Sequence, residues 1–152
     1  YGWRGASAGN LERFLDDFRS GRPVLTGADH VLLNTYAMAA CYSANGDGTI
    51  DFPFDLETAE VRPDVWERWL DWDPVRRVPA AAETLRTMRA IWIDAGRSDE
   101  FFLDLGAAAY RRALADAGVP DEIVHYELFD GRHGNIVWRY PLSLAFLAER
   151  LA

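Results

Sequence analysis

The fold of this chain is decided by residues 89–134, which read RAIWIDAGRSDEFFLDLGAAAYRRALADAGVPDEIVHYELFDGRHG. Residues 89–93, which are apolar after Arg89, predict a buried strand. The pattern over 100–117 predicts a helix, which glycine and proline close, and residues 123–129 predict a second strand before the glycine-rich loop 130–134. Alternation of strand, helix and strand favours a parallel sheet with a crossover helix.

Each predicted strand is followed by a loop with a candidate catalytic side chain. Asp99 lies in the first loop, just after Gly96, and His133 lies between Gly131 and Gly134 in the second. The carboxyl ends of parallel strands open onto one edge of a sheet, so we expect the two side chains to meet there. A carboxylate that orients a histidine predicts the acid and base of a catalytic triad. The alternative is a helix cap at Asp99 and a surface histidine at His133.

The other titratable residues of this region fit those roles less well. Asp94 is the rival acid, but it ends the strand before the loop has turned, so Asp99 is preferred. Glu100 is expected to be a surface or capping group. His125 alternates with apolar residues in a strand and is expected to be partly buried, while His30 opens a helix. Neither histidine has a second ligand at a suitable spacing, so the sequence predicts no metal site and no cofactor.

The first half of the chain predicts helices. Residues 11–18 form an amphipathic pattern, and residues 31–41 form a more uniformly apolar one that predicts a buried helix capped by Asp29. Pro63 opens a short helix after a long polar loop. Pro74 and Pro79 are expected to end this helix, and residues 80–88 are expected to form another short helix.

These patterns predict an α/β protein with two regions: a helical, cap-like region at 1–88 and a βαβα segment at 89–152. Two parallel strands alone make a poor sheet, because such strands are normally buried within a larger one. The central sheet is therefore expected to be incomplete in this chain. The chain also begins at Tyr1 without Met, so we expect it to be a fragment or a processed piece of a longer protein.

Composition limits the possible partners. The chain has 152 residues, 49% of them hydrophobic, and a net charge of -8, with no Lys/Arg cluster that would bind nucleic acid. No apolar run approaches the roughly 18 residues that a membrane span requires. Cys41 is the single cysteine and is expected to be a small buried apolar residue, so no internal disulfide is possible and a cytoplasmic location is expected.

Several stretches resemble a known family. IWIDAGRSDEFFLDLGAAAYRRALADAGVP (91–120) and HYELFDGRHGNIVWRYPLSLAFLAERL (125–151) resemble the C-terminal part of the esterase D-like and enterochelin-esterase-like family of α/β-hydrolases. LLNTYAMAACYS (32–43) and FPFDLETAEVRPDVWERWLDWDPVRRV (52–78) resemble the helical stretch that some members place between nucleophile and acid. The resemblance implies the C-terminal part of an α/β-hydrolase and serine hydrolysis of a carboxylic ester or thioester. It also implies that Asp99 is the triad acid and His133 the base.

The segment Gly5-Ala6-Ser7-Ala8-Gly9 matches G-x-S-x-G, the pattern around the nucleophile of this fold. A nucleophile elbow needs a hydrophobic strand before it and a tightly packed helix after it. Only residues 1–4 precede this segment, and the helix that follows carries charges that suit solvent. We therefore expect Ser7 to be a loop or capping residue and the nucleophile to lie upstream of Tyr1.

Residues 43–54, SANGDGTIDFPF, imitate the calcium loop of an EF-hand. Ser43 replaces the carboxylate of the first position and Phe54 the bidentate glutamate of the twelfth, so a plain turn is expected. The aromatic residues of the cap-like region are expected to be core residues or, as a weaker alternative, the lining of an acyl or aryl pocket: Tyr36, Phe52, Phe54, Trp66, Trp69 and Trp72.

Two other functions are alternatives to the esterase. The first is a non-catalytic hydrolase-like module that lacks a nucleophile and acts by binding or assembly, with the missing N-terminal half or a second copy of the chain as partner. The second is a calcium-binding domain built on residues 43–54. For the esterase, the expected partners are a small ester or thioester substrate and the same missing half or second copy.

Overall fold

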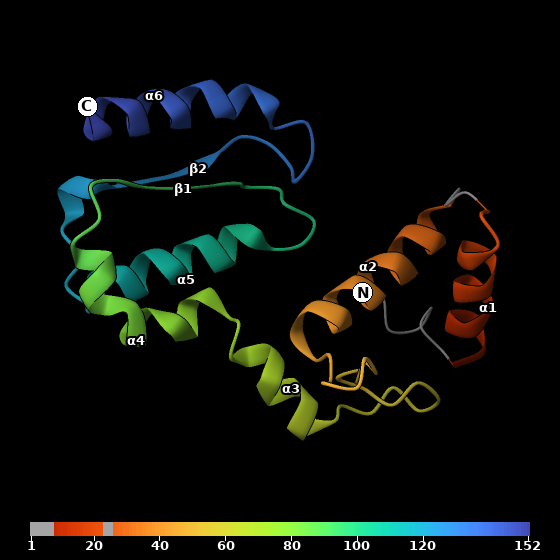
Figure 1. Cartoon of the computed structure of the whole chain (residues 1–152). Coiled ribbons are helices and arrows are strands. Elements are labelled where there is room, and N and C mark those ends of the chain that lie inside the picture. Colours follow the sequence, from red (N-terminus) through yellow and green to blue (C-terminus); the bar gives the residue numbers. More distant parts are fainter. Residues whose placement is uncertain (1–7, 23–25) are drawn as a thin grey trace. The chain divides into compact units, whose positions relative to one another are not determined.

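The computed structural model describes residues 8–22 and 26–152. The chain divides into two compact units, Tyr1–Trp72 and Asp73–Ala152, and the second has a mixed α/β architecture (Figure 1). The sequence pattern placed its division later, before Arg89. Helix α4 (Pro74–Arg86) packs against α5 (Leu103–Asp116), and these contacts assign α4 to the unit that holds the sheet.

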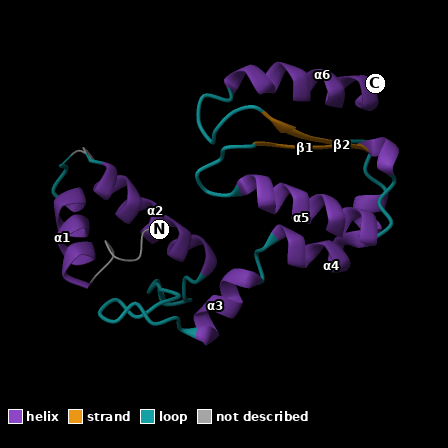
Figure 2. Cartoon of the chain, turned by 180° about the vertical axis from the view of Figure 1, so that it is seen from behind, coloured by secondary structure: helices purple, strands orange, loops and turns teal. Residues whose placement is uncertain are grey.

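The second unit is built on a parallel pair of strands, β1 (Ile91–Gly96) and β2 (Val124–Phe129). Helices α4 and α5 lie on one face of the pair, and α6 (Tyr140–Leu151) lies on the other, as Figures 1 and 2 show from opposite sides. The mixed α/β class predicted from the sequence is therefore confirmed. The α5 connection carries the chain from β1 back to the start of β2, so both strands point their carboxyl ends the same way.

The core of the second unit lies between the sheet and its two helices. Val78 and Leu85 of α4, Leu114 of α5 and Val119 are buried together, and strand residues such as Ile93 pack against them. Alternate residues of each strand face this core, while their neighbours face α6. The alternation separates an apolar face from a face that carries polar and charged side chains.

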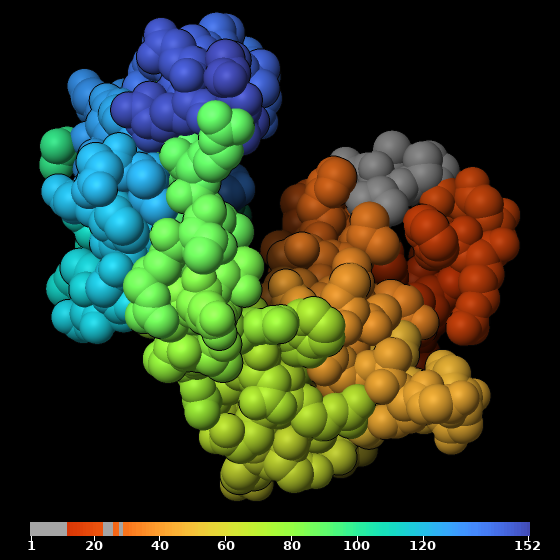
Figure 3. Space-filling model, turned by 60° about the vertical axis from the view of Figure 1, so that its left-hand side comes forward, coloured from red at the N-terminus to blue at the C-terminus, as the bar shows by residue number. Residues whose placement is uncertain are grey.

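Two arginine side chains of the second unit bind carbonyl oxygens at the C-terminal ends of helices. Arg89 Nη1 donates to the carbonyl oxygen of Leu151 at 3.0 Å, next to the end of α6. Figure 3 shows the segment before β1 (green) against the C-terminal residues (dark blue) at this place. Arg86 Nη1 donates to the carbonyl oxygen of Ala117 at 2.7 Å, which joins the end of α4 to the end of α5.

The first unit is a small helical body. It contains α1 (Ala8–Arg19), α2 (Gly27–Tyr42) and α3 (Pro63–Leu70), with a core around Phe14, Leu32 and Phe54. Helix α2 begins with a capping box, in which the side chains of Thr26 and Asp29 each accept the other's backbone N–H. The predicted cap at Asp29 was therefore wrong by three residues, since Thr26 is the N-cap.

Other helix predictions need correction. Pro74 begins α4 behind an Asp73 N-cap, and Pro79 lies inside that helix next to the buried Val78, so neither proline ends it. Helix α5 begins at Leu103, because the preceding residues form a loop. Cys41 is exposed, since the buried side of α2 runs through positions 32, 35 and 39. Among the described residues, no helix is both long enough and apolar enough to cross a membrane.

Candidate active site

Asp99 is held inside the loop that follows β1. Its backbone N–H donates to the carbonyl oxygen of Gly96 at 3.2 Å, and its Oδ1 accepts the backbone N–H of Phe101 at 2.8 Å. Only 3% of the side chain is exposed. Because Asp99 caps this turn, its second carboxylate oxygen is held in a fixed direction while α5 begins only four residues later.

His133 lies in the loop that follows β2. This loop turns at Gly131, where a side chain would overlap the ring of Phe129, with a Cβ only 2.6 Å from the nearest ring carbon. The His133 side chain is 48% exposed, so its ring is open to solvent on one side. The Phe101 ring and the imidazole pack in a T-shaped arrangement, with the ring centroids 4.8 Å apart.

The structure brings Asp99 and His133 together. The imidazole Nδ1 lies 3.1 Å from Asp99 Oδ2, within hydrogen-bonding distance. An ionised carboxylate can only accept, so Nδ1 carries the proton, and in the neutral ring Nε2 is the nitrogen with the lone pair. This is the tautomer that a general base needs, because Nε2 is then the atom that takes a proton from a nucleophile.

The environment keeps Asp99 ionised. Burial alone raises the pKa of this carboxyl group, but the hydrogen bonds from the Phe101 backbone, the His133 ring and the Leu103 backbone outweigh it. The net effect is a pKa below the usual range of an aspartate. The acid therefore carries its charge at neutral pH.

Backbone contacts fix the two loops to each other. The N–H of Arg97 donates to the carbonyl oxygen of Phe129 at 2.9 Å, and the N–H of Ser98 donates to that of Gly131 at 3.0 Å. Gly96 allows this approach, because a Cβ at that position would lie 2.6 Å from the carbonyl carbon of Gly131 and closer still to its oxygen. The position of Asp99 relative to His133 is thus set by the main chain.

Glu100 is a residue whose role the sequence did not indicate. Its Oε2 accepts the backbone N–H of His133 at 3.3 Å, so the residue expected to be a surface or capping group contacts the histidine loop. Nothing in the local pattern pointed to this contact, because its partner is 33 residues away in sequence.

Asp94, the rival acid, is used in an ion pair. Its Oδ2 accepts Nε–H of Arg139 at 2.8 Å, and the same guanidinium binds both carboxylate oxygens of Glu127, which stands opposite Asp94 in the sheet. The Arg139 side chain is 5% exposed and lies over the rings of Phe129 and Trp138. Arg139 lies in the short turn η3 (Val137–Arg139), just after the histidine loop, so this ion pair joins that loop to both strands.

The hydrogen bonds and charges around Arg139 shift the pKa values of Glu127 and of Arg139 itself. Hydrogen bonding to Arg139 outweighs desolvation and lowers the pKa of Glu127. The same bond, together with Asp94, raises the pKa of Arg139. Glu127 and Arg139 are therefore charged at neutral pH, and Asp94 is bound to Arg139 rather than to His133.

The other two histidines lie apart from this pair. His125 stacks on its strand partner Trp92 with centroids 3.8 Å apart and is partly buried, as predicted. His30 is exposed near the start of α2. Across residues 8–22 and 26–152, no three His, Cys, Asp or Glu side chains are grouped as metal ligands.

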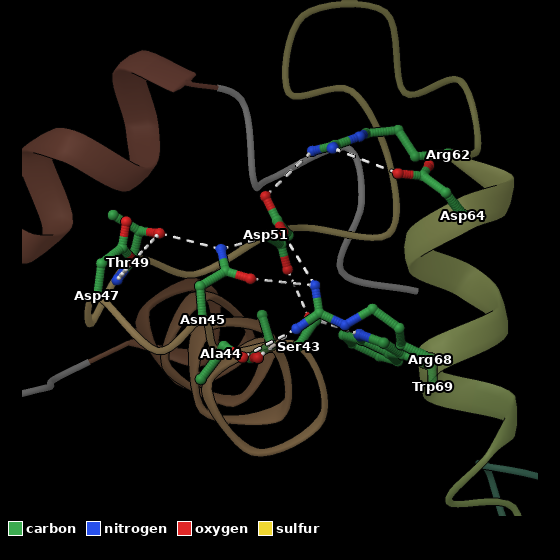
Figure 4. A network of polar contacts seen from close by, with 11 residues as sticks. Ser43, Ala44, Asn45, Asp47, Thr49, Asp51, Arg62, Asp64, Arg68 and Trp69 are labelled. Carbon is green, nitrogen blue, oxygen red and sulfur yellow. Dashed lines mark hydrogen bonds and ion pairs between the residues drawn. The ribbon is translucent and has the colours of Figure 1, made fainter.

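The EF-hand-like loop is closed by an arginine (Figure 4). Arg68 of α3 donates to Asp51 Oδ2 at 3.0 Å, to Asn45 Oδ1 at 3.3 Å and to the carbonyl oxygen of Ala44 at 2.8 Å. The side chain of Asp47 accepts instead from the backbone and hydroxyl of Thr49. The oxygens that a calcium ion would need therefore accept hydrogen bonds from Arg68 and from Thr49 of the same loop. This is the arrangement expected of a plain turn.

The aromatic residues of the first unit have several surroundings. Phe52 and Phe54 line a hollow of about 520 Å³ together with Leu56 and Arg62. Trp69 donates from Nε1 to Ser43 Oγ at 2.9 Å and contacts the rings of Tyr42 and Trp66. Trp72 is 52% exposed. The hollow matches the weaker expectation of an aromatic pocket for two of the six residues, Phe52 and Phe54.

Within the second unit, no serine hydroxyl of the described residues is hydrogen-bonded to His133. Ser7, the serine of the G-x-S-x-G match, lies outside the described residues. No protein-family model and no curated protein sequence matches this chain.

Proposed function

We propose that this chain supplies the acid and base of a serine carboxylester hydrolase of the α/β-hydrolase fold, within a longer parent protein. The observation that carries the proposal is the 3.1 Å contact between Asp99 and His133 at the carboxyl ends of neighbouring parallel strands. Such a pair, with an ionised acid and an accessible Nε2, suits proton transfer from a serine hydroxyl.

In the proposed reaction, His133 Nε2 takes the serine proton as the hydroxyl oxygen attacks the ester or thioester carbonyl. The imidazolium then gives the proton to the leaving alcohol or thiol, and an acyl-serine forms. Water next attacks the acyl group with His133 again as base, which releases the acid and restores the serine. Asp99 remains ionised throughout and stabilises the imidazolium. We place the serine upstream of Tyr1, in agreement with the esterase resemblance of residues 91–151.

The test is labelling with a fluorophosphonate, which transfers its phosphonyl group to an activated serine and releases fluoride. The 152-residue chain and the parent protein are labelled in parallel, and peptide mass spectrometry locates the adduct. We expect an adduct on an upstream serine of the parent that His133→Gln and Asp99→Asn each slow by at least about a hundredfold. A parent that takes no label, or labels equally fast without His133, would overturn the proposal. An adduct on Ser7 in the 152-residue chain would support the hydrolase function but would identify Ser7, rather than an upstream serine, as the nucleophile.

A second candidate is a non-catalytic binding or assembly module. It is favoured by the apolar side chains that α6 leaves exposed, such as Tyr140 (54%), Leu144 (63%) and Leu151 (59%), and by a sheet of only two strands. Its partner would be the N-terminal half of the parent or a second copy of the chain. Self-association of the chain in light scattering, combined with a parent that takes no label, would favour this module.

A cytoplasmic location is part of the proposal. It fits a chain whose single cysteine excludes an internal disulfide. Fractionation of cells that express the tagged parent protein is the direct measurement, and recovery in an extracellular or envelope fraction would contradict it.

A further inference from the structure

Two neighbouring carboxylates hold the same histidine at two different atoms. Asp99 Oδ2 contacts the ring at Nδ1, 3.1 Å away, and Glu100 Oε2 accepts the backbone N–H of His133 at 3.3 Å. The first contact orients the imidazole about its own bonds. The second contact is with the backbone N–H of His133, so it fixes the backbone position from which the ring projects.

The second contact continues a ladder of hydrogen bonds between the two loops. Arg97 and Ser98 donate their backbone N–H groups to the carbonyl oxygens of Phe129 and Gly131. At His133 the direction reverses, since the donor is now in the histidine loop and the acceptor is the side chain of Glu100. Beyond the two backbone hydrogen bonds, the Glu100 carboxylate therefore makes the next contact between the loops.

We propose that Glu100 is a positioning residue that fixes the backbone of His133 while Asp99 fixes its ring. The proposal rests on the proposed function for its meaning in catalysis, but its structural content is independent of turnover. The imidazole is 48% exposed and contacts the Phe101 ring, so an anchor on its main chain further limits the directions in which Nε2 can point.

The charge of Glu100 adds to this effect. Hydrogen bonds from its own backbone N–H and from that of His133 lower the pKa of Glu100, so it is ionised at neutral pH. A charged acceptor makes a stronger hydrogen bond to an amide than a neutral one does. It also places negative charge in the loop where the imidazolium forms.

The test uses nuclear magnetic resonance on the full ¹⁵N-labelled chain. The exchange rate of the His133 amide proton reports the backbone anchor, and the ring nitrogen shifts report which nitrogen carries the proton. Glu100→Ala removes the acceptor, Glu100→Asp keeps the charge but is too short to bridge the gap, and Glu100→Gln keeps an acceptor oxygen. Glu149→Ala, which removes an exposed carboxylate from α6, is the matched control.

We expect the His133 amide to exchange about tenfold faster in E100A and E100D, the factor that one hydrogen bond of ordinary net strength provides. The Nδ1-protonated population should fall in both variants. E100Q should stay within about threefold of the unsubstituted chain, and Glu149→Ala should match it. The amide of Ile93 in β1 should exchange at the same rate throughout, which shows that the sheet is intact.

The proposal is overturned if the His133 amide and ring are the same in E100A and E100D as in the unsubstituted chain. It is also overturned if Glu149→Ala changes them equally. Because these readouts need no substrate, a parent protein that hydrolyses no ester would end the proposed function while leaving the positioning role intact. Where ester hydrolysis is found, E100D should lower kcat about tenfold with KM nearly unchanged, and E100Q should restore most of kcat.

Discussion

Gly96 and Gly131 touch backbone to backbone at the junction of the acid and histidine loops. A Cβ at Gly96 would lie 2.6 Å from the carbonyl carbon of Gly131 and 2.8 Å from the carbonyl oxygen of Arg132. Both contacts are with main-chain atoms, which cannot rotate away as a side chain does. The geometry of the Asp99–His133 pair therefore depends on the absence of a single methyl group.

Gly96→Ala is expected to separate the loops and to destabilise the chain by about 2 kcal/mol, the usual result of forcing a methyl group into packed main chain. The free energy of unfolding is measured by urea denaturation, and the His133 ring nitrogens should lose the signature of the Asp99 contact. Gly106→Ala is the control, because a Cβ there meets no atom within 4 Å and alanine favours the α5 helix. Equal stability of both variants would contradict the close approach.

Arg139 offers a second prediction. Its guanidinium pairs with both Asp94 and Glu127, which stand opposite each other on the two strands. Arg139→Met keeps an apolar stem over Phe129 but leaves two carboxylates facing each other, so we expect a loss of about 3 kcal/mol in the free energy of unfolding. Arg139→Lys should lose less, because it keeps the charge without the planar fork.

The control for this cluster is Arg112→Met on the exposed side of α5, which should change stability by less than about 0.5 kcal/mol. Adding Glu127→Gln to Arg139→Met should recover part of the loss, because one unpaired charge is removed. A double variant that is less stable than Arg139→Met alone would show that repulsion between the acids is not the cause.

The order of strand, acid loop, helix, strand and histidine loop could be predicted because its signals are local. Apolar runs mark the strands, and Gly118 and Pro120 mark the end of α5. The start of α5 could not be predicted in this way. Phe102 has a positive φ of 61°, which a bulky residue rarely adopts, and this conformation turns the chain from the acid loop into the helix at Leu103.

The meeting of Asp99 and His133 was predictable from topology, whereas the side chains that support it were not. The contacts of Glu100 and Arg139 join residues that are 33 and 45 positions apart, which no periodic pattern encodes. One signal for Arg139 was present: Asp94 and Glu127 place charge inside two strands that are otherwise mostly apolar. Once the register sets these acids opposite each other, a buried cation is required.

Asp99 should make the stability of the chain depend on pH. Its pKa is lowered in the folded state, so its contribution is complete above its unfolded pKa of about 4 and is lost as the pH falls through the lower folded pKa. The difference in unfolding free energy between the unsubstituted chain and Asp99→Asn should therefore be largest near pH 7 and shrink below pH of about 4. Urea titrations across that range measure it.

Asp116→Asn at the exposed end of α5 serves as the matched variant for this experiment and should change stability by less than about 0.5 kcal/mol at each pH. The interpretation fails if the gap between the unsubstituted chain and Asp99→Asn widens as the solution is made more acidic. That result would mean that Asp99 is held in its neutral form, which would not stabilise an imidazolium.

Arg68 should make the EF-hand-like loop indifferent to calcium. Its guanidinium already binds Asp51, Asn45 and the carbonyl oxygen of Ala44, so millimolar calcium should shift the Tm by less than about 1 °C. Arg68→Ala should lower the unfolding free energy by about 1 to 2 kcal/mol, since hydrogen bonds to a partly exposed charge are lost. Arg19→Ala, which removes an exposed pair with Asp16, should cost less than about 0.5 kcal/mol. A rise in Tm with calcium in the unsubstituted chain would instead support the calcium-binding rival, because it would mean that the ion displaces Arg68 from the loop.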